Sequence, residues 1–154
     1  MTALQSELIA EDLMSSDPIC VEPSTTLRQL ARTFAENEIS GAPVVDAQGR
    51  LVGLVSQTDL IRRCVHGVVD LPPSFLFEML AETGSEDREM AAEPSFCVED
   101  FMTEDPLTAT RESPMSEIAR QMCERRVHRV IVKDSQNVPV GIITSLDLAC
   151  ALSR

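Results

Sequence analysis

The chain has 154 residues, of which 44% are hydrophobic, and it contains five Phe but no Trp or Tyr. This length suits one domain, or two small halves that share a core of aliphatic and Met side chains. The formal net charge of -12 disfavours contact with anionic surfaces, so we expect neither a nucleic acid nor a membrane as partner.

The first residues, MTALQSELIAEDLM, carry acids where a secretion signal would be basic, and no apolar run approaches the roughly 18 residues of a membrane span. These features predict a cytoplasmic protein. The five cysteines form no CxxC pair, which argues against a zinc site or a disulfide framework. We expect buried, reduced thiols, no metal and no required cofactor.

A comparison of the chain with itself reveals an internal repeat. When the sequence is shifted by 88 positions, residues 12–61 align with residues 100–149 without a gap, and 14 of the 50 pairs are identical. About three identities are expected by chance. The identical pairs include Met14/Met102, Asp17/Asp105, Gly53/Gly141 and Asp59/Asp147. The chain is therefore a duplicated unit.

Each unit predicts the same order of elements. An Asp-Pro pair precedes a short apolar strand, ICV or LTA, and then an amphipathic helix that we expect Ser24 or Thr25, and Ser113, to cap. Two β-branched runs around an AQG or SQN turn predict a strand pair, and TDLIRRCV or LDLACALSR predicts a final helix. The fold class is α/β, with two strand-helix-strand-strand-helix repeats. Halves of about 50 residues bury too little alone, so we expect them to pack with pseudo-twofold symmetry.

We divide the chain into an N-terminal segment (1–11), a first unit (12–64), a linker (65–97) and a second unit (98–154). The linker stretch LPPSFLFEMLAETG predicts a short amphipathic helix, and the acidic stretch that follows it, residues 85–95, predicts an exposed, mobile segment. The apolar stripes of the helices, such as residues 27–34 and LDLACAL, exceed what one core covers. A homodimer through helical faces is therefore expected.

The unit that begins LMSSDPI and continues with GAPVVDAQGRLVGLVSQTDL resembles the cystathionine-β-synthase (CBS) domain, and the tandem resembles a CBS pair, or Bateman module. The resemblance covers the chain except residues 1–10 and the linker. It implies a regulatory module that binds AMP, ADP, ATP or S-adenosylmethionine between the units, dimerises, and signals to an unknown protein target. The alternative is a ligand-free dimerisation or protein-interaction module. No phosphate loop or nucleophile–base pair indicates an enzyme.

The stretch GIITSLD predicts a binding site at the start of a helix, where backbone N–H groups are unpaired and attract anions. An ionised Asp can accept hydrogen bonds from ribose hydroxyls. The resemblance implies this role for Asp147 beside Thr144, which would contact phosphate, and the same roles for Asp59 and Ser56. The alternative, on the residues alone, is that each Asp only caps its helix.

The run ERRVHRVIVK holds the densest positive charge of the chain. Similarity to the CBS domains of the AMP-activated kinase regulatory subunit implies that His128 and Arg129 contact phosphate; a satisfied core or edge histidine is the alternative for His128. The first unit has Ser40 and Gly41 at these positions, followed closely by Pro43, and so lacks the charge.

The two sites are thus expected to differ. The first unit keeps a hydroxyl at Thr58, where the second has Leu146. We expect one competent site, centred on Thr144, Asp147, His128 and Arg129, and a weaker or empty one at Ser56 and Asp59. The resemblance places adenine between apolar side chains such as Val127 and Ile131, with its edge near Leu107 and Thr108.

Overall fold

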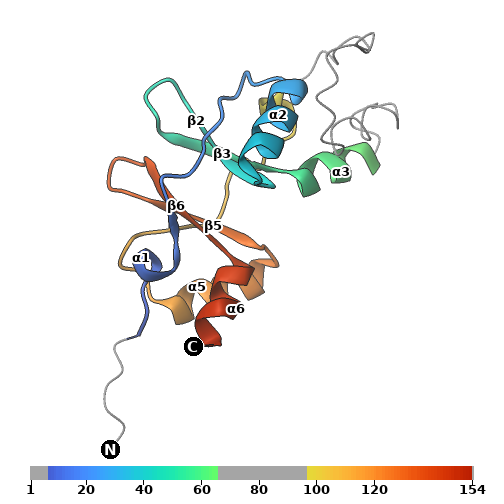
Figure 1. Ribbon diagram of the computed structural model, residues 1–154. Helices are drawn as coiled ribbons and strands as arrows, with labels where there is room; N and C mark the ends of the chain where they lie inside the picture. Colours follow the sequence, from blue (N-terminus) through green and yellow to red (C-terminus); the bar gives the residue numbers. More distant parts are fainter. Residues whose placement is uncertain (1–6, 66–96, 154) are drawn as a thin grey trace, which may run out of the picture.

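The computed structural model describes residues 7–65 and 97–153 (Figure 1). The helices are α1 (Ala10–Leu13), α2 (Leu27–Asn37), α3 (Gln57–Val65), α5 (Met115–Arg125) and α6 (Ser145–Leu152), with a short 3₁₀ helix, η1 (Val98–Asp100). The strands are β1 (Ser15–Ser16), β2 (Gly41–Val45), β3 (Leu51–Ser56), β4 (Thr108–Ala109), β5 (Arg129–Lys133) and β6 (Pro139–Thr144). The amphipathic helix and acidic stretch expected in the linker lie outside the described residues.

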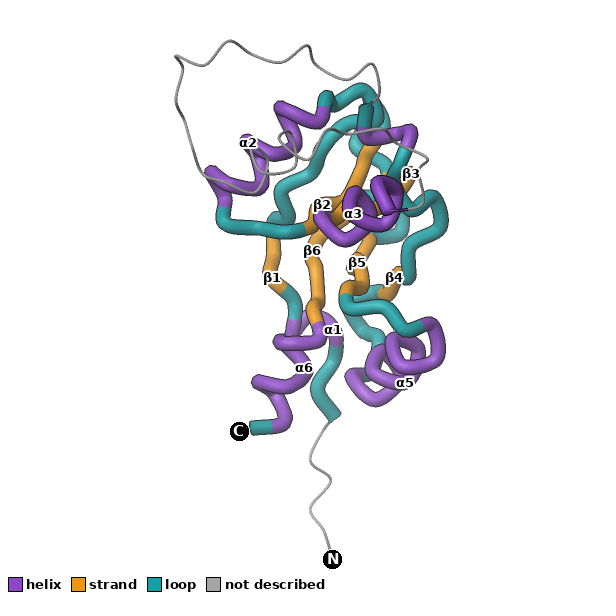
Figure 2. Tube along the Cα trace, turned by 90° about the vertical axis from the view of Figure 1, so that its right-hand side faces the viewer, coloured by secondary structure: helices purple, strands orange, loops and turns teal. Residues whose placement is uncertain are grey.

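An antiparallel hairpin forms the centre of each repeat: β2 pairs with β3, and β5 pairs with β6. Both hairpins contain a register shift at the same place, after Val44 and after Val132. Both also turn through a residue with positive φ, 80° at Gly49 and 65° at Asn137. Figure 2 shows the second hairpin extended on both sides into a sheet of order β1-β6-β5-β4. The duplication predicted from the sequence is confirmed.

The repeats exchange their first segments. Strand β1 of the first repeat pairs with β6 of the second, with Ser15 opposite Ile142. The equivalent bridge joins Thr103, in the first segment of the second repeat, to Leu54 in the first. Figure 1 shows the N-terminal segment lying beside β6 before the chain continues to α2. Each hairpin is therefore completed by a segment from the other repeat.

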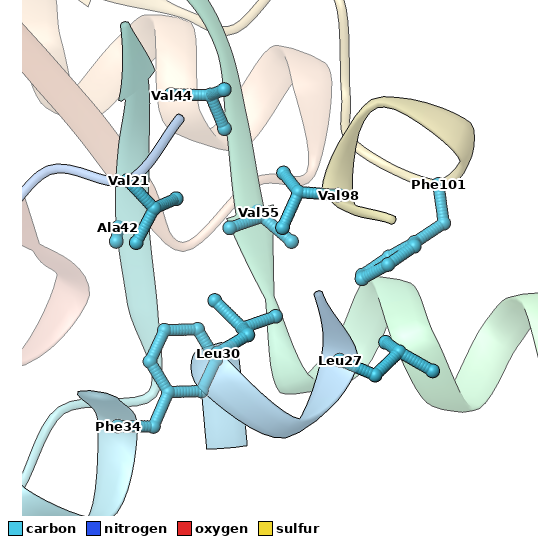
Figure 3. Packing of buried hydrophobic residues seen from close by; sticks show 9 residues of the cluster. All are labelled: Val21, Leu27, Leu30, Phe34, Ala42, Val44, Val55, Val98 and Phe101. Atoms are coloured by element: carbon cyan, nitrogen blue, oxygen red, sulfur yellow. The ribbon is translucent and has the colours of Figure 1, made fainter. Parts of the chain in front are cut away.

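The exchange carries apolar side chains into the opposite core. Ala10 is buried in the second core, whereas Val98 and Phe101 are buried in the first (Figure 3). The first core also contains Val21, Leu27, Leu30, Phe34, Ala42, Val44 and Val55. The second contains Leu107, Ala109, Ile118, Met122, Val130, Val132 and Ile143. Because each core includes residues from both repeats, neither repeat buries its apolar face by itself.

Two glycines make room for the exchanged segments. A Cβ on Gly53 would stand 2.8 Å from the Met102 sulfur and 2.8 Å from the Thr103 carbonyl oxygen. A Cβ on Gly141 would stand 2.8 Å from Cγ of Met14. These distances are shorter than van der Waals contact, so the strand backbone must be bare for the segment to lie over it. The identities Gly53/Gly141 and Met14/Met102 in the repeat have this physical reason.

The cap of α2 lies one residue beyond the expected positions. The Thr26 side chain accepts a hydrogen bond from the Gln29 backbone N–H, and the Gln29 side chain accepts one from the Thr26 N–H. This reciprocal pair is a capping box. Ser24 and Thr25 were the expected caps; Thr25 instead accepts from the N–H of Glu22 and closes the preceding turn.

The cap expected at Ser113 is also wrong, for the same reason. Its hydroxyl accepts from the Thr110 N–H in the turn before α5. The N-cap of α5 is Pro114, which makes no side-chain cap. Glu7, from the exchanged N-terminal segment, accepts from the Ser116 N–H at 2.9 Å. A carboxylate from the first repeat thus supplies the negative charge that a helix start favours.

The cysteines whose side chains the structure describes contradict one further expectation, and the side chain of Cys64 lies outside that part. Cys20, Cys123 and Cys150 are exposed free thiols, and Cys97 is partly exposed. They are not part of either core, because they occupy the outward positions of helix and loop segments that the apolar residues leave to solvent.

Candidate functional site

The end of each hairpin leads into a helix through a matched cap. In the first repeat, the Ser56 N–H and hydroxyl both donate to Asp59 Oδ2 at 3.0 Å. In the second, the Thr144 N–H and hydroxyl donate to Asp147 Oδ2 at 2.7 and 3.0 Å. Each hydroxyl in turn accepts from the backbone N–H of its Asp. Both aspartates therefore are helix caps, as one interpretation of the sequence predicted.

Capping uses only one oxygen of each carboxylate. The second oxygen of Asp59 accepts a hydrogen bond from the Thr103 hydroxyl at 3.3 Å. The second oxygen of Asp147 receives no hydrogen bond from the described part of the chain. We call Ser56, Asp59 and Thr103 the Asp59 site, and Thr144 and Asp147, with the cavity described next, the Asp147 site. The two sites therefore differ at this second oxygen. It is occupied by Thr103 in the Asp59 site and open in the Asp147 site.

A cavity of about 340 Å³ lies at the Asp147 site. Its walls come from the segment after β1, the turn before β2, and the two strands β5 and β6. The lining residues are Ser15, Ser16, Asp17, Pro18, Ile19, Glu38, Ile39, Ser40, Gly41, Arg129, Ile142 and Thr144. Asp147 does not line the cavity, but Thr144, whose hydroxyl donates to it, does. Small-molecule sites have volumes of about 300–1,000 Å³, so a small ligand fits this cavity.

The chain turns sharply at the cavity wall. Asp17 has φ of 54°, a left-handed conformation that Asp tolerates better than most residues, and Pro18 follows it. The Asp17 N–H donates to the Val140 carbonyl oxygen at 3.3 Å, which fastens the turn to β6. Glu38, at the C-terminal end of α2, also has φ of 54°. The wall is thus made by two left-handed turns of the first repeat set against strands of the second.

Arg129 is the basic residue of this cavity. Its guanidinium donates a hydrogen bond to the Ser40 hydroxyl. The side chain passes so close to Gly41 that a Cβ there would stand 2.7 Å from Nε of Arg129. Burial lowers the pKa of Arg129, and the charge of Asp59 opposes that lowering. The guanidinium remains charged, because an arginine pKa lies far above neutral pH.

The structure separates the residues expected around adenine. Ile131 is fully buried, and its repeat equivalent, Pro43, is fully buried too. Alternate residues of β2 and β5 enter the two cores, so Pro43 and Ile131 lie on the opposite faces of these strands. Leu107 is buried in the second core, and Val127 packs against it. Ile131 and Leu107 thus have no surface to offer a base.

His128 adjoins the Asp147 site through its backbone, since its carbonyl oxygen accepts from the Ser145 N–H at 3.0 Å, but it does not line the cavity. It is exposed, and it precedes β5. Its repeat equivalent, Ser40, lines the cavity with Thr144, whose own equivalent is Ser56. The repeat symmetry therefore assigns His128 to the Asp59 site, along with the segment from Thr103 to Thr108. Thr58 is exposed on α3.

Of the residues expected at one site, the structure brings together Thr144, Asp147 and Arg129, and it adds Ser40, which was expected in the other site. The sequence interpretation missed the segment Ser15–Ile19, together with Glu38, Ile39 and Ile142, because it sought the site within one repeat. A signal for the segment was present: the Asp-Pro pair occurs at the same place in both repeats, at residues 17–18 and 105–106.

Other kinds of site find no support in the part of the chain that the structure describes. Within residues 7–65 and 97–153, no group of three or more His, Cys, Asp or Glu side chains could hold a metal ion. Over the same ranges, every helix is too short or too polar to span a bilayer.

Comparisons with known proteins agree with this architecture. The family model of the CBS domain matches residues 10–66 and 98–154. The uncharacterized protein MJ1426 of Methanocaldococcus jannaschii is 31% identical over 156 residues, covering 94% of this chain and 91% of the relative. The CBS domain pair of protein MJ0100, solved with 5′-methylthioadenosine and S-adenosyl-L-methionine, has a TM-score of 0.74 at 21% identity, covering 96% of this chain and 97% of that one. CBSX2 in complex with AMP has a TM-score of 0.69 at 24% identity, with 94% and 96% covered.

Proposed function

Because the chain belongs to the CBS domain family, we propose that it is a non-catalytic regulatory module, which binds an adenosine-containing ligand at the Asp147 site and signals occupancy to a protein partner. One observation carries the proposal: a single cavity is lined both by Arg129 and by Thr144, the residue bonded to Asp147, whose second carboxylate oxygen is open among the described residues. A nucleotide has matching groups, since it carries ribose hydroxyl donors next to an anionic phosphate.

The ligand chemistry follows from the groups around the cavity. Asp147 Oδ1 accepts from a ribose hydroxyl while Oδ2 keeps the helix cap, so binding does not cost the cap its hydrogen bonds. Arg129 pairs with phosphate in exchange for its neutral partner, Ser40. Ile19, Ile39 and Ile142 supply apolar surface for a base. The adenosine compounds in the MJ0100 and CBSX2 structures support this choice of ligand class.

Calorimetric titration with AMP, ADP, ATP, S-adenosylmethionine and adenosine tests the proposal. A hydrogen bond to a charged group contributes about 1.5–3 kcal/mol, so Asp147→Asn should weaken binding by about ten- to a hundredfold. Asp59→Asn should weaken it less. Arg129→Gln should weaken AMP much more than adenosine, whereas Arg32→Gln, which removes an exposed charge from α2, should change neither.

The competing function is a ligand-free interaction module, and the complete caps at Asp59 and Asp147 favour it. On this alternative both aspartates only stabilise helix starts. Dissociation constants above about 1 mM for every compound would favour the ligand-free interaction module. Equal losses of affinity for AMP and adenosine in Arg129→Gln would instead indicate a general defect of the site.

The proposed module acts as a homodimer through α3 and α6. No residue of α6 is buried, although its sequence is SLDLACAL, and Leu146 and Leu152 are 69% and 75% exposed. Ile61 on α3 is 47% exposed. The expected contribution of residues 27–34 is corrected, because Leu27, Leu30 and Phe34 are buried in the first core. Sedimentation at micromolar concentration should give a dimer, and Leu146→Glu should give a monomer, because it places charge in the apolar contact.

A further inference from the structure

The side chain of Arg129 connects the two sites. Its backbone pairs with Thr144 in the β5–β6 hairpin, and the Thr144 hydroxyl belongs to the cap of Asp147. Its guanidinium extends into the first repeat, where it donates to Ser40 and lies against Gly41. Arg129 is thus attached at the cap of one repeat and directed toward the hairpin of the other.

Gly41 is next to the other cap. It is the register partner of Ser56 in the β2–β3 hairpin, and Ser56 holds the carboxylate of Asp59. The guanidinium is within the electrostatic reach of that carboxylate, since Asp59 counteracts the effect of burial on the pKa of Arg129. The guanidinium of Arg129 is therefore in the field of Asp59, while its backbone adjoins the cap of Asp147.

The first repeat has no counterpart of this side chain. The 88-residue equivalence relates Arg129 to Gly41. A side chain at residue 41 would collide with Arg129, because its Cβ would stand 2.7 Å from Nε. The packing of the two hairpins thus leaves room for one guanidinium between the sites.

We propose that the Asp147 and Asp59 sites share Arg129, so that a phosphate-bearing ligand at one site weakens the binding of a second such ligand at the other. This inference rests on the proposed function and adds a regulatory property to it. A phosphate at either site attracts the guanidinium, and the side chain cannot pair closely with two phosphates on opposite sides of the hairpin contact at once. The coupling is negative and depends on phosphate.

Binding measurements on single-site variants test the coupling. Asp147→Asn leaves the Asp59 site, and Asp59→Asn leaves the Asp147 site; the amide oxygen of Asn preserves an acceptor for each cap. Titration of each variant with AMP gives one single-site association constant, and titration of the wild-type chain gives two stepwise constants. The coupling factor is the product of the two single-site constants divided by the product of the two stepwise constants. We expect a factor of about 5–20 for AMP and about one for adenosine, which lacks the phosphate.

Arg129→Gln should reduce the AMP factor to about one, and the matched control Arg32→Gln should leave it unchanged. A second supporting result concerns stoichiometry. Each single-site variant would bind AMP, yet the wild-type chain, with both sites intact, would bind only one molecule. A factor near one for AMP, an adenosine factor as large as that for AMP, or failure of Asp147→Asn to bind AMP at all overturns the coupling and leaves the proposed function intact. Absence of binding by every adenosine compound removes the proposed function, and the coupling with it.

Discussion

The two repeats have similar cores, but they differ at the surface where their hairpins face each other. Most core positions correspond, as with Leu30 and Ile118 or Val55 and Ile143, and both members of these pairs are apolar and buried. At the contact between the hairpins, Gly41 stands where the other repeat has Arg129. A duplicated fold can keep a packing pattern that both halves need, while the surface between the halves diverges. The difference between the two sites arises at this surface.

Four predictions test how far the repeats are equivalent, beginning with the exchanged segments. Phe101→Ala should lower the free energy of unfolding by about 3–5 kcal/mol, because it empties a fully buried position in the first core. Leu13→Ala, at the equivalent position, should cost less than about 2 kcal/mol, since Leu13 is only partly buried. Urea denaturation measures both values.

Hydrogen exchange then locates the loss. Phe101→Ala should reduce protection of amides in β2 and β3 more than in β5 and β6, although Phe101 is close in sequence to the second repeat. Greater loss in β5 and β6 would contradict the exchange.

The glycines beneath the exchanged segments should differ in their tolerance of a methyl group. Gly53→Ala and Gly141→Ala should each cost about 1–3 kcal/mol by overpacking, with the larger loss at Gly53. The reason is that Gly53 faces a backbone oxygen of Thr103, while Gly141 faces only the Met14 side chain. Thermal unfolding of double variants sharpens the test. Met14→Ala should rescue part of Gly141→Ala, because it removes Cγ but leaves Cβ 2.9 Å from the added methyl group, and an equal or larger rescue of Gly53→Ala by Met102→Ala would contradict it.

The helix caps provide a smaller difference. Thr26→Ala should destabilise the protein by about 1 kcal/mol, because it removes the capping box of α2. Ser113→Ala should cost less than about 0.5 kcal/mol, because Ser113 closes a turn and does not cap α5. Chemical denaturation of the two variants measures these losses, and equal losses would show that the hydroxyl at Ser113 also stabilises the helix.

The smallest effect concerns the carboxylate that replaces the missing cap. Hydrogen bonds from Ser116 lower the pKa of Glu7 below its ordinary value of 4.5. A lowered folded pKa adds stability above pH 4.5, and that stability is lost as the pH falls through the folded value. The melting temperature of the wild type should exceed that of Glu7→Gln at neutral pH and approach it below the folded pKa. A pH-independent difference would exclude the carboxylate charge as its cause.

The sequence was sufficient to predict the duplication, the hairpins and the helices that follow them, because each depends on periodicity within a short stretch. It could not predict the exchange. Leu54 and Ile142 occupy equivalent positions, so a strand at Ser15 matches either one equally well. The same ambiguity placed His128 and Leu107 beside Asp147, since an internal repeat does not specify which copy of a segment completes a site.

The exchange also determines when the fold can form during synthesis. Strand β1 leaves the ribosome before the first hairpin, but its partner, β6, is made only after both the first hairpin and β5. The hairpin of the first repeat likewise waits for the bridge at Thr103. The first core cannot close until Phe101 has emerged, and the second cannot close until β6 has, because long-range pairs form only after both members are available. The nascent first repeat therefore keeps its apolar surface exposed until the first segment of the second repeat, Val98 to Thr103, has been translated.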